Sequence, residues 1–178
     1  MTETIEILEL RDGEFEPALE DLGEILKACV EAGASVGFIE PFSKANSLHF
    51  WAEQVFGEVK AGRRFLLAAK VHGHIVGTVQ LIVGMLPNQA HRGEISKLLV
   101  HPDYRRRGLG GLLMRAAEEK ALLQGKQLLT LDTRTGDMAE PLYVSLGFEK
   151  AGVIPGYCRS PEQGSQVLDA TTYMYKSL

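Results

Sequence analysis

The chain has 178 residues, of which 45% are hydrophobic and 24% charged, so it can bury a core of its own and is not a disordered segment. Its 23 acidic and 19 basic residues leave a formal net charge of -4, which argues against a nucleic-acid partner. Cys29 and Cys158 form neither a C-x-x-C pair nor a zinc spacing, and the longest apolar run is too short to span a bilayer. We therefore expect a single cytoplasmic domain over residues 1–178, with reduced thiols, no metal and no membrane partner.

The first part of the chain predicts one strand and two helices. Residues 4–10 alternate between apolar and polar side chains, which indicates a strand. From 15 to 30, apolar residues recur every three or four positions, a pattern typical of an amphipathic helix, and Gly33 is placed to end it. Ser43 is a suitable N-cap for a second helix, which should end at Gly62.

The rest of the chain adds strands and two further helices. Two apolar segments, 65–71 and 75–85, flank a His72-Gly73-His74 turn and predict an antiparallel hairpin. A strand over 94–100 stops before Pro102 and leads through a glycine-rich turn into a long helix. The remaining expected elements are a strand at 126–132, a short helix at 138–146, and strands at 148–153 and 171–176. This order predicts an α/β (mixed α+β) fold in which helices flank a central mixed, mostly antiparallel sheet.

The turn over 105–111 combines positive charge with a backbone that a ligand can approach closely. It reads Arg-Arg-Arg-Gly-Leu-Gly-Gly and opens a helix, where unpaired N–H groups and the helix dipole favour an anion. Guanidinium groups beside glycines suit a diphosphate. A triphosphate-binding loop would need Gly-Lys-Ser or Gly-Lys-Thr, which the chain lacks, and a dinucleotide fold would need glycine where Leu113 stands.

The pattern Arg105-x-x-Gly108-x-Gly110 between a strand and a helix resembles the acetyl-CoA signature of the GNAT superfamily of N-acetyltransferases. Downstream, Ala139-x-x-x-Tyr143-x-x-Leu146-Gly147-Phe148 is similar to the second cofactor motif of that superfamily, in which a tyrosine lies near the cofactor sulfur. The resemblance implies a GNAT-like domain that binds acetyl-CoA as cosubstrate. It also implies an enzyme in which the acceptor amine attacks the thioester directly.

Shorter strings resemble the tabtoxin-resistance acetyltransferase subgroup. They are Gly33-Ala34-Ser35-Val36-Gly37-Phe38, Glu94-x-x-Lys97-Leu98-x-Val100, Leu131-Asp132-Thr133, Gly136, Ala139-Glu140 and Pro155-Gly156-Tyr157-Cys158. This likeness implies a small-molecule amine as acceptor, such as a β-lactam amino-acid toxin or an antibiotic-like compound, and hence a role in toxin resistance. Two alternatives stay open, a protein or peptide N-acetyltransferase and an acyl-CoA-binding regulatory module without turnover. The oligomeric state is open as well, a homodimer included.

The resemblance also implies roles for individual residues. Tyr143 would be the general acid for the departing thiolate, while Glu94 and Asp132 are both candidates for the base that acts on the amine. Ser35 and Phe38, in the loop between the first two helices, and Tyr157, in a later loop, would border the acceptor. Coenzyme A would contact the strand before the turn and the turn itself, through Leu98, Leu99, Val100, Arg105, Arg106, Arg107, Gly108, Leu109, Gly110 and Gly111.

Two other patterns give weaker indications. Residues 33–37 match the G-x-S-x-G motif of serine hydrolases, but that motif needs a strand before the serine, and here a helix precedes it. His72 and His74 could point two imidazoles the same way, but no third ligand has a suitable spacing. Neither a hydrolase nor a metal site is therefore expected.

Overall fold

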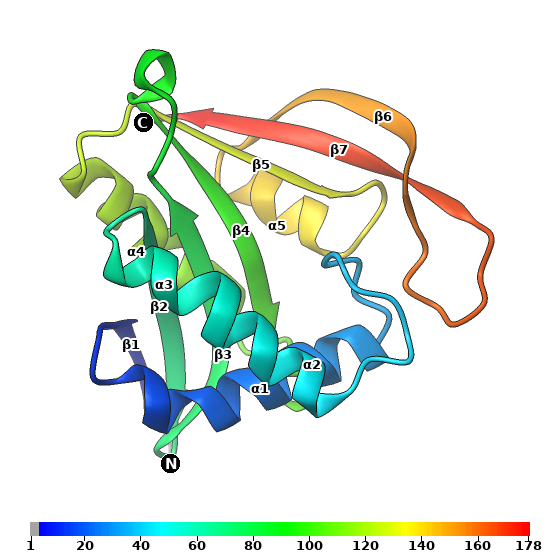
Figure 1. Ribbon diagram of the computed structural model, residues 1–178. Coiled ribbons are helices and arrows are strands. Elements are labelled where there is room, and N and C mark those ends of the chain that lie inside the picture. The colour runs from blue at the N-terminus through cyan, green and yellow to red at the C-terminus, as the bar shows by residue number, and fades with distance from the viewer. Residues whose placement is uncertain (1–3) are drawn as a thin grey trace.

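Seven strands form one sheet in the computed structural model, which describes residues 4–178 (Figure 1). Met1 to Glu3, part of the expected domain, lie outside the described residues. In spatial order the strands are β1 (Ile5–Leu10), β2 (Arg64–Val71), β3 (His74–Ile82), β4 (Arg92–Val100), β5 (Leu128–Arg134), β7 (Leu168–Ser177) and β6 (Glu149–Arg159). All neighbours pair antiparallel except β4 and β5, which are parallel. The prediction of a mixed, mostly antiparallel sheet is confirmed.

Helices cover both faces of this sheet (Figure 1). One face, called the α1 face below, carries α1 (Phe15–Glu31), α2 (Lys44–His49), the π-helical turn η1 (Phe50–Val55) and α3 (Phe56–Lys60). The other, the α4 face, carries α4 (Leu109–Leu123) and α5 (Ala139–Ser145). Two short 3-10 turns, η2 (Pro87–Gln89) and η3 (Pro102–Tyr104), lie in the connections. Within residues 4–178, no helix is long and apolar enough to cross a membrane.

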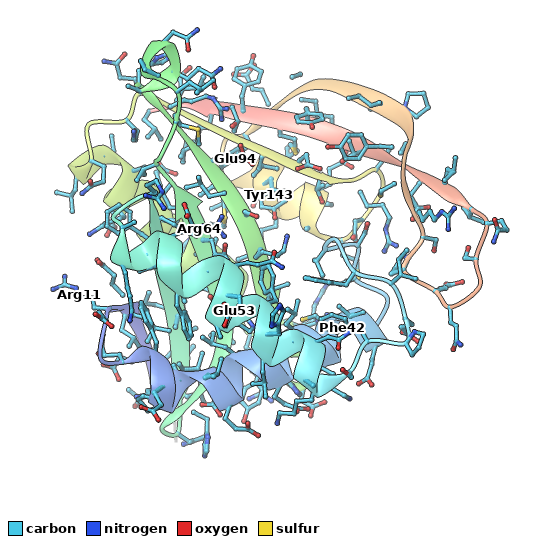
Figure 2. The ribbon with its side chains drawn as sticks, viewed as in Figure 1. Arg11, Phe42, Glu53, Arg64, Glu94 and Tyr143 are labelled. Atoms are coloured by element: carbon cyan, nitrogen blue, oxygen red, sulfur yellow. The ribbon has the colours of Figure 1, made fainter. Side chains whose placement is uncertain are left out.

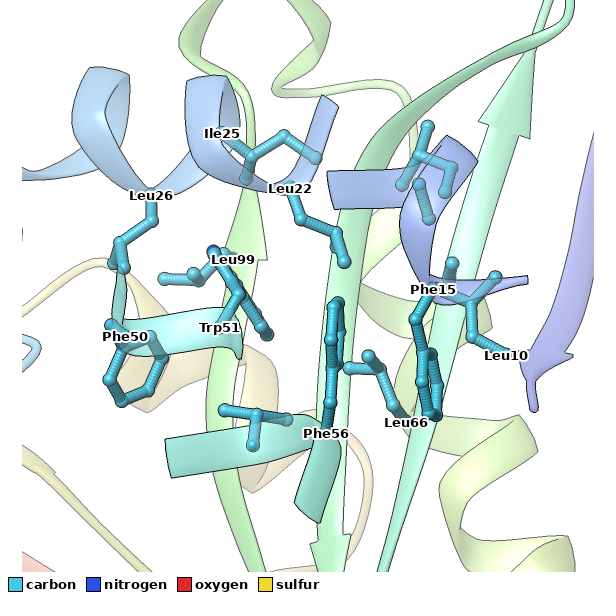
Figure 3. Packing of buried hydrophobic residues seen from close by; sticks show 14 of the residues in the cluster. Leu10, Phe15, Leu22, Ile25, Leu26, Phe50, Trp51, Phe56, Leu66 and Leu99 are labelled. Carbon is cyan, nitrogen blue, oxygen red and sulfur yellow. The ribbon is translucent and has the colours of Figure 1, made fainter. Parts of the chain in front are cut away.

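Aromatic side chains pack among aliphatic ones in the core on the α1 face (Figure 3). The rings of Phe15 and Phe56 stack with their centroids 4.2 Å apart and so join α1 to α3. Trp51 is fully buried between α1 and the sheet, with Phe50 edge-on to it at 5.3 Å. Both early helices are thereby fixed against β2 and β3, which holds the α1–α2 loop over the middle of the sheet.

The substitution Trp51→Ala should lower the free energy of unfolding by about 3–5 kcal/mol, because it leaves a large cavity in this core. Leu123→Ala at the end of α4 is the matched control, since Leu123 is 80% exposed, and it should change stability by less than about 0.5 kcal/mol. Urea denaturation followed by circular dichroism measures both values. Equal losses in the two variants would contradict the assignment of Trp51 to the core.

Most elements begin or end within a few residues of the sequence-based expectation, and three differences are informative. Strand β3 ends at Ile82 rather than at residue 85, and the second predicted helix is interrupted by η1. Strand β6 continues through Pro155 to Arg159, although the proline was expected in a loop. This is possible because β6 is an edge strand, so the missing N–H costs no hydrogen bond in the sheet, and the register shift between Ile154 and Cys158 absorbs the irregular residues.

Candidate functional site

A gap opens in the middle of the sheet, where β4 and β5 part. The two parallel strands pair only from Arg92 opposite Leu128 to Glu94 opposite Thr130, although β4 continues to Val100 and β5 to Arg134. Beyond Glu94, the edge of β4 that faces β5 has no neighbouring strand, so its backbone groups are available to a ligand. A cavity of about 980 Å³ occupies this gap.

A bulge in β4 changes the direction of the side chains that border the gap. Thr78 of β3 pairs with Leu99 and Gln80 pairs with Ser96, so two residues of β4 lie opposite one of β3. Lys97, in this bulge, has a left-handed φ of 51°, which costs a non-glycine residue roughly 1 kcal/mol. As a result Leu98 contacts the core of the α4 face, while Lys97 lies against Phe50 on the α1 face.

The glycine-rich turn lies at the end of β4 and opens α4 into the same cavity. Gly108 has a φ of 79° and caps α4 without a side-chain hydrogen bond, which leaves the N–H groups of the first turn available. At Gly110 a Cβ would lie 3.0 Å from Leu142 Cδ2, so glycine permits the close approach of α4 and α5. The turn residues that line the cavity are Arg105, Arg106, Gly108, Leu109, Gly110 and Gly111, together with Leu98, Leu99 and Val100 of β4.

The three consecutive arginines have different surroundings. Arg105 lines the cavity, donates through Nε to the carbonyl of Val100 at 3.2 Å, and approaches Cys29 Sγ at 3.8 Å. Arg107 instead donates to the carbonyl of Asp103 at 2.9 Å, lies over the ring of Tyr104, and is not among the residues that line the cavity. The turn therefore directs Arg105 and Arg106, but not Arg107, towards a ligand in the cavity.

Tyr143 projects from α5 into the cavity from the α4 face. Burial raises the pKa of its phenol well above the ordinary value, and the negative charges of Asp137 and Asp132 act in the same direction. The hydroxyl thus stays protonated at neutral pH. It can donate a proton, but it cannot serve as a base there.

The two candidate bases lie near each other but only one borders the cavity. Asp132 is exposed, lines the cavity, and accepts a hydrogen bond from Thr171 Oγ1 at 3.0 Å. Glu94 is two residues away on the neighbouring strand, forms an ion pair with Arg92 at 3.4 Å, and is not among the lining residues. Figure 2 shows Tyr143 beside the gap and Glu94 nearer the start of β4.

Two connections border the cavity on the α1 face. The α1–α2 loop contributes Ser35 and Phe38, and the β6–β7 hairpin contributes Tyr157, so all three expected acceptor residues line the cavity. The backbone N–H of Glu40 donates to the carbonyl of Pro161 at 2.9 Å, which ties the loop to the hairpin. Tyr157 and Tyr173 share a hydrogen bond of 2.9 Å between their hydroxyl groups.

Several residues gain a place at the site that sequence reasoning did not give them, and three of them bear on its chemistry. Cys29 was expected only as core packing; it is buried, but it also borders the cavity and donates to the carbonyl of Val100 at 3.4 Å. Thr171 orients Asp132, and Lys97 supplies a charge. Lys97 is part of the sequence pattern Glu94-x-x-Lys97-Leu98-x-Val100, but the direction of its side chain is set by the bulge, which depends on the pairing of β4 with β3. In residues 4–178, no group of three or more His, Cys, Asp or Glu could hold a metal ion.

Residues 19–148, which include the gap, the turn and Tyr143, match the family model described as the acetyltransferase (GNAT) family. The chain belongs to this family. It is accordingly an acetyl-CoA-dependent N-acetyltransferase, and the expectation drawn from the Arg-Gly pattern is confirmed.

Solved structures share the fold of this acetyltransferase at low sequence identity. A protein described as a phosphinothricin N-acetyltransferase superposes with a TM-score of 0.78 at 16% identity, covering 98% of this chain and 99% of that one. A ribosomal-protein-alanine N-acetyltransferase from Brucella melitensis superposes with a TM-score of 0.75 at 23% identity, covering 97% of this chain and 99% of that one. An acetyltransferase from Salmonella typhimurium, solved with acetyl-CoA, superposes with a TM-score of 0.74 at 20% identity, covering 98% of this chain and 94% of that one. Proteins described by different acceptors thus have this fold, so the fold does not identify the acceptor.

Proposed function

We propose that this acetyltransferase acetylates the amine of a small molecule, with an amino-acid toxin or antibiotic-like compound as the favoured class. The observation that carries the proposal is that two connections tied to each other border the cavity on the α1 face. There the α1–α2 loop and the β6–β7 hairpin are joined through Glu40 and Pro161, above a space bordered by Ser35, Phe38 and Tyr157. A protein or peptide acceptor would need an open groove at this place, so this alternative is less favoured. A cytoplasmic location and a homodimer stay predictions.

The residues at the other end of the cavity fit acetyl-CoA. The uncapped first turn of α4, with Arg105 and Arg106 beside it, suits the diphosphate. The unpaired edge of β4 from Leu98 to Val100 suits the amide groups of the pantetheine arm. When bound, acetyl-CoA supplies an activated acetyl group as a thioester. A backbone N–H of the same edge would stabilise the negative charge that develops on the thioester oxygen.

Tyr143 and Asp132 divide the proton transfers between them. Asp132 takes a proton from the protonated amine, directly or through water, and the neutral amine nitrogen then bonds to the carbonyl carbon. The carbon–sulfur bond breaks, Tyr143 gives its proton to the thiolate, and Tyr143 regains a proton as the nitrogen loses its second one to become the amide. The two side chains belong to opposite faces of the sheet but border one gap, so acceptor and thioester can meet between them.

A thiol-release assay with acetyl-CoA and a panel of small amines, β-lactam amino acids included, tests the proposal. Release that depends on one class of small amine supports it, and Gly108→Trp, which places a bulky side chain at the turn, should abolish it. Release only with peptides would favour the protein acetyltransferase instead. Binding of coenzyme A without release for any acceptor would favour a regulatory module, and no binding up to millimolar concentration would overturn the cofactor site.

Arg105→Ala should raise the Kd for acetyl-CoA about 10-fold or more, because a charge-assisted hydrogen bond contributes roughly 1.5–3 kcal/mol. Arg107→Ala should change the Kd less than about twofold, because its guanidinium lies against Asp103 and Tyr104 outside the cavity lining. Isothermal titration calorimetry at fixed ionic strength compares the two variants. A larger effect of Arg107→Ala would contradict the orientation of the turn.

A further inference from the structure

Lys97 brings a positive charge to the acceptor side of the cavity. It borders the cavity, and its ammonium lies 5.8 Å from the centre of the Phe50 ring. A Cβ added at Gly37 of the α1–α2 loop would lie 3.9 Å from Lys97 Nζ. The ammonium is thus located under the loop that borders the cavity on the α1 face, beside the backbone that borders the gap.

The protein provides little to compensate this charge. Within residues 4–178, no hydrogen bond or ion pair reaches the ammonium of Lys97, and the contact with Phe50 is made through the ring. Burial lowers the pKa of Lys97, as does the positive charge of Arg64, while Asp132 and Glu94 oppose this shift. An ammonium with three donors and no oxygen acceptor in a half-buried position is complementary to an anionic ligand.

The backbone holds Lys97 in this place. Its φ of 51° is one that glycine adopts without strain, whereas a lysine there is strained. Without the bulge, the alternation of β4 would place Lys97 on the same face as Ile95, whose side chain lies in the core of the α4 face. The bulge therefore moves this one charge from the α4 face to the α1 face of the sheet.

The diphosphate of the cofactor is not the partner of this charge. The first turn of α4, whose N–H groups suit the diphosphate, lies on the α4 face, and Arg105 reaches Cys29 only at the end of β4, whereas Lys97 lies against Phe50 on the α1 face. Lys97 also precedes the end of β4 by three residues, which span at most about 10 Å, and the turn begins only beyond that end. The anion that Lys97 meets must therefore come from the acceptor side.

We propose that Lys97 is a specificity-determining residue that binds an acid group, a carboxylate or an oxyanion of similar size, on the acceptor amine. This rests on the proposed function. Asp132 borders the same cavity from β5 and its side chain is on the same face of the sheet, since the alternate residues Leu129 and Leu131 belong to the core of the α4 face. Lys97 and Asp132 together offer a cation for the acid and an anion for the amine. The substrate class that fits is a zwitterionic, amino-acid-like acceptor.

The test compares the twenty common L-amino acids and phosphinothricin with the amides of their acid groups, using thiol release from acetyl-CoA. We expect the wild-type protein to prefer acids over amides at least 10-fold in kcat/KM. Lys97→Met should remove that preference by raising KM for acids 10- to 100-fold, with kcat for amides within about threefold. Lys97→Gly, which relieves the strained φ, should do the same, and Lys97→Arg should restore part of the preference.

Two controls distinguish binding of the acceptor's acid group from a structural role of Lys97 and from an effect on the cofactor. The Kd for acetyl-CoA should stay within about twofold in all three variants, and a larger change would overturn the assignment to the acceptor. Equal losses for acids and amides in Lys97→Met and Lys97→Gly would also overturn it, because they would indicate a structural role. If the wild-type protein acetylates amides and uncharged amines but not acids, this inference fails while the proposed function stands. If it acetylates no small amine, the proposed function fails, and this inference fails with it.

Discussion

Tyr143→Phe is expected to lower kcat about 100-fold or more, while the Kd for acetyl-CoA changes less than about threefold. Only the hydroxyl is lost, so the ring keeps its contact with Phe148 and its place in the core of the α4 face. A general acid contributes about 100- to 10,000-fold to a rate, because proton transfer to the departing sulfur stabilises the charge that develops as the carbon–sulfur bond breaks. Pre-steady-state acetyl transfer and equilibrium binding measure the two quantities separately.

The raised pKa of Tyr143 adds a dependence on pH. An ordinary tyrosine loses its proton near pH 10, whereas burial and the nearby carboxylates keep the Tyr143 phenol protonated above that value. In the wild-type protein, kcat should therefore show no decline from loss of this proton up to about pH 10. Tyr175→Phe is the matched control, because the Tyr175 hydroxyl contacts Glu149 away from the cavity, and kcat should stay within about twofold. An unchanged kcat in Tyr143→Phe would remove the acid role.

Much of this site could be predicted from the sequence because its signals are local. Gly108 permits a left-handed helix cap and Gly110 permits the close approach of α4 and α5, and neither property depends on residues distant in the sequence. The order of the predicted strands and helices is enough to indicate the fold class. The net charge of -4 does not exclude an anionic ligand, because Arg105 and Arg106 line the cavity at one helix N-terminus, where the local field exceeds the effect of total charge.

The features of the site and fold that could not be predicted depend on contacts between residues distant in the sequence, or on adjacent residues of the same type. Three adjacent arginines are equivalent in sequence, and only the positions of Asp103 and Tyr104 turn Arg107 away. The direction of Lys97 follows from the register between β3 and β4. The course of β6 through its proline depends on its place at the sheet edge.

Asp132→Asn should reduce kcat/KM about 100-fold at pH 7, because the asparagine side chain cannot take a proton from the amine. The asparagine keeps a side-chain oxygen that can accept the hydrogen bond from Thr171, so the orientation of the side chain at position 132 is preserved. Glu94→Gln is the matched comparison and should cost less than about fivefold, since Glu94 lies outside the cavity lining and pairs with Arg92. The sequence alone did not separate these two carboxylates.

The pH profile distinguishes a base from a residue that merely orients the acceptor. An alkyl amine is protonated at pH 7 and becomes neutral in solution as the pH approaches about 10, the range in which a lysine side chain titrates. If Asp132 removes that proton, the deficit of Asp132→Asn should shrink about 10-fold between pH 7 and pH 10. A deficit that is constant with pH would mean that Asp132 holds the amine in place without accepting its proton. A larger loss in Glu94→Gln than in Asp132→Asn would assign the base to Glu94, which could reach the amine only through water because it does not border the cavity.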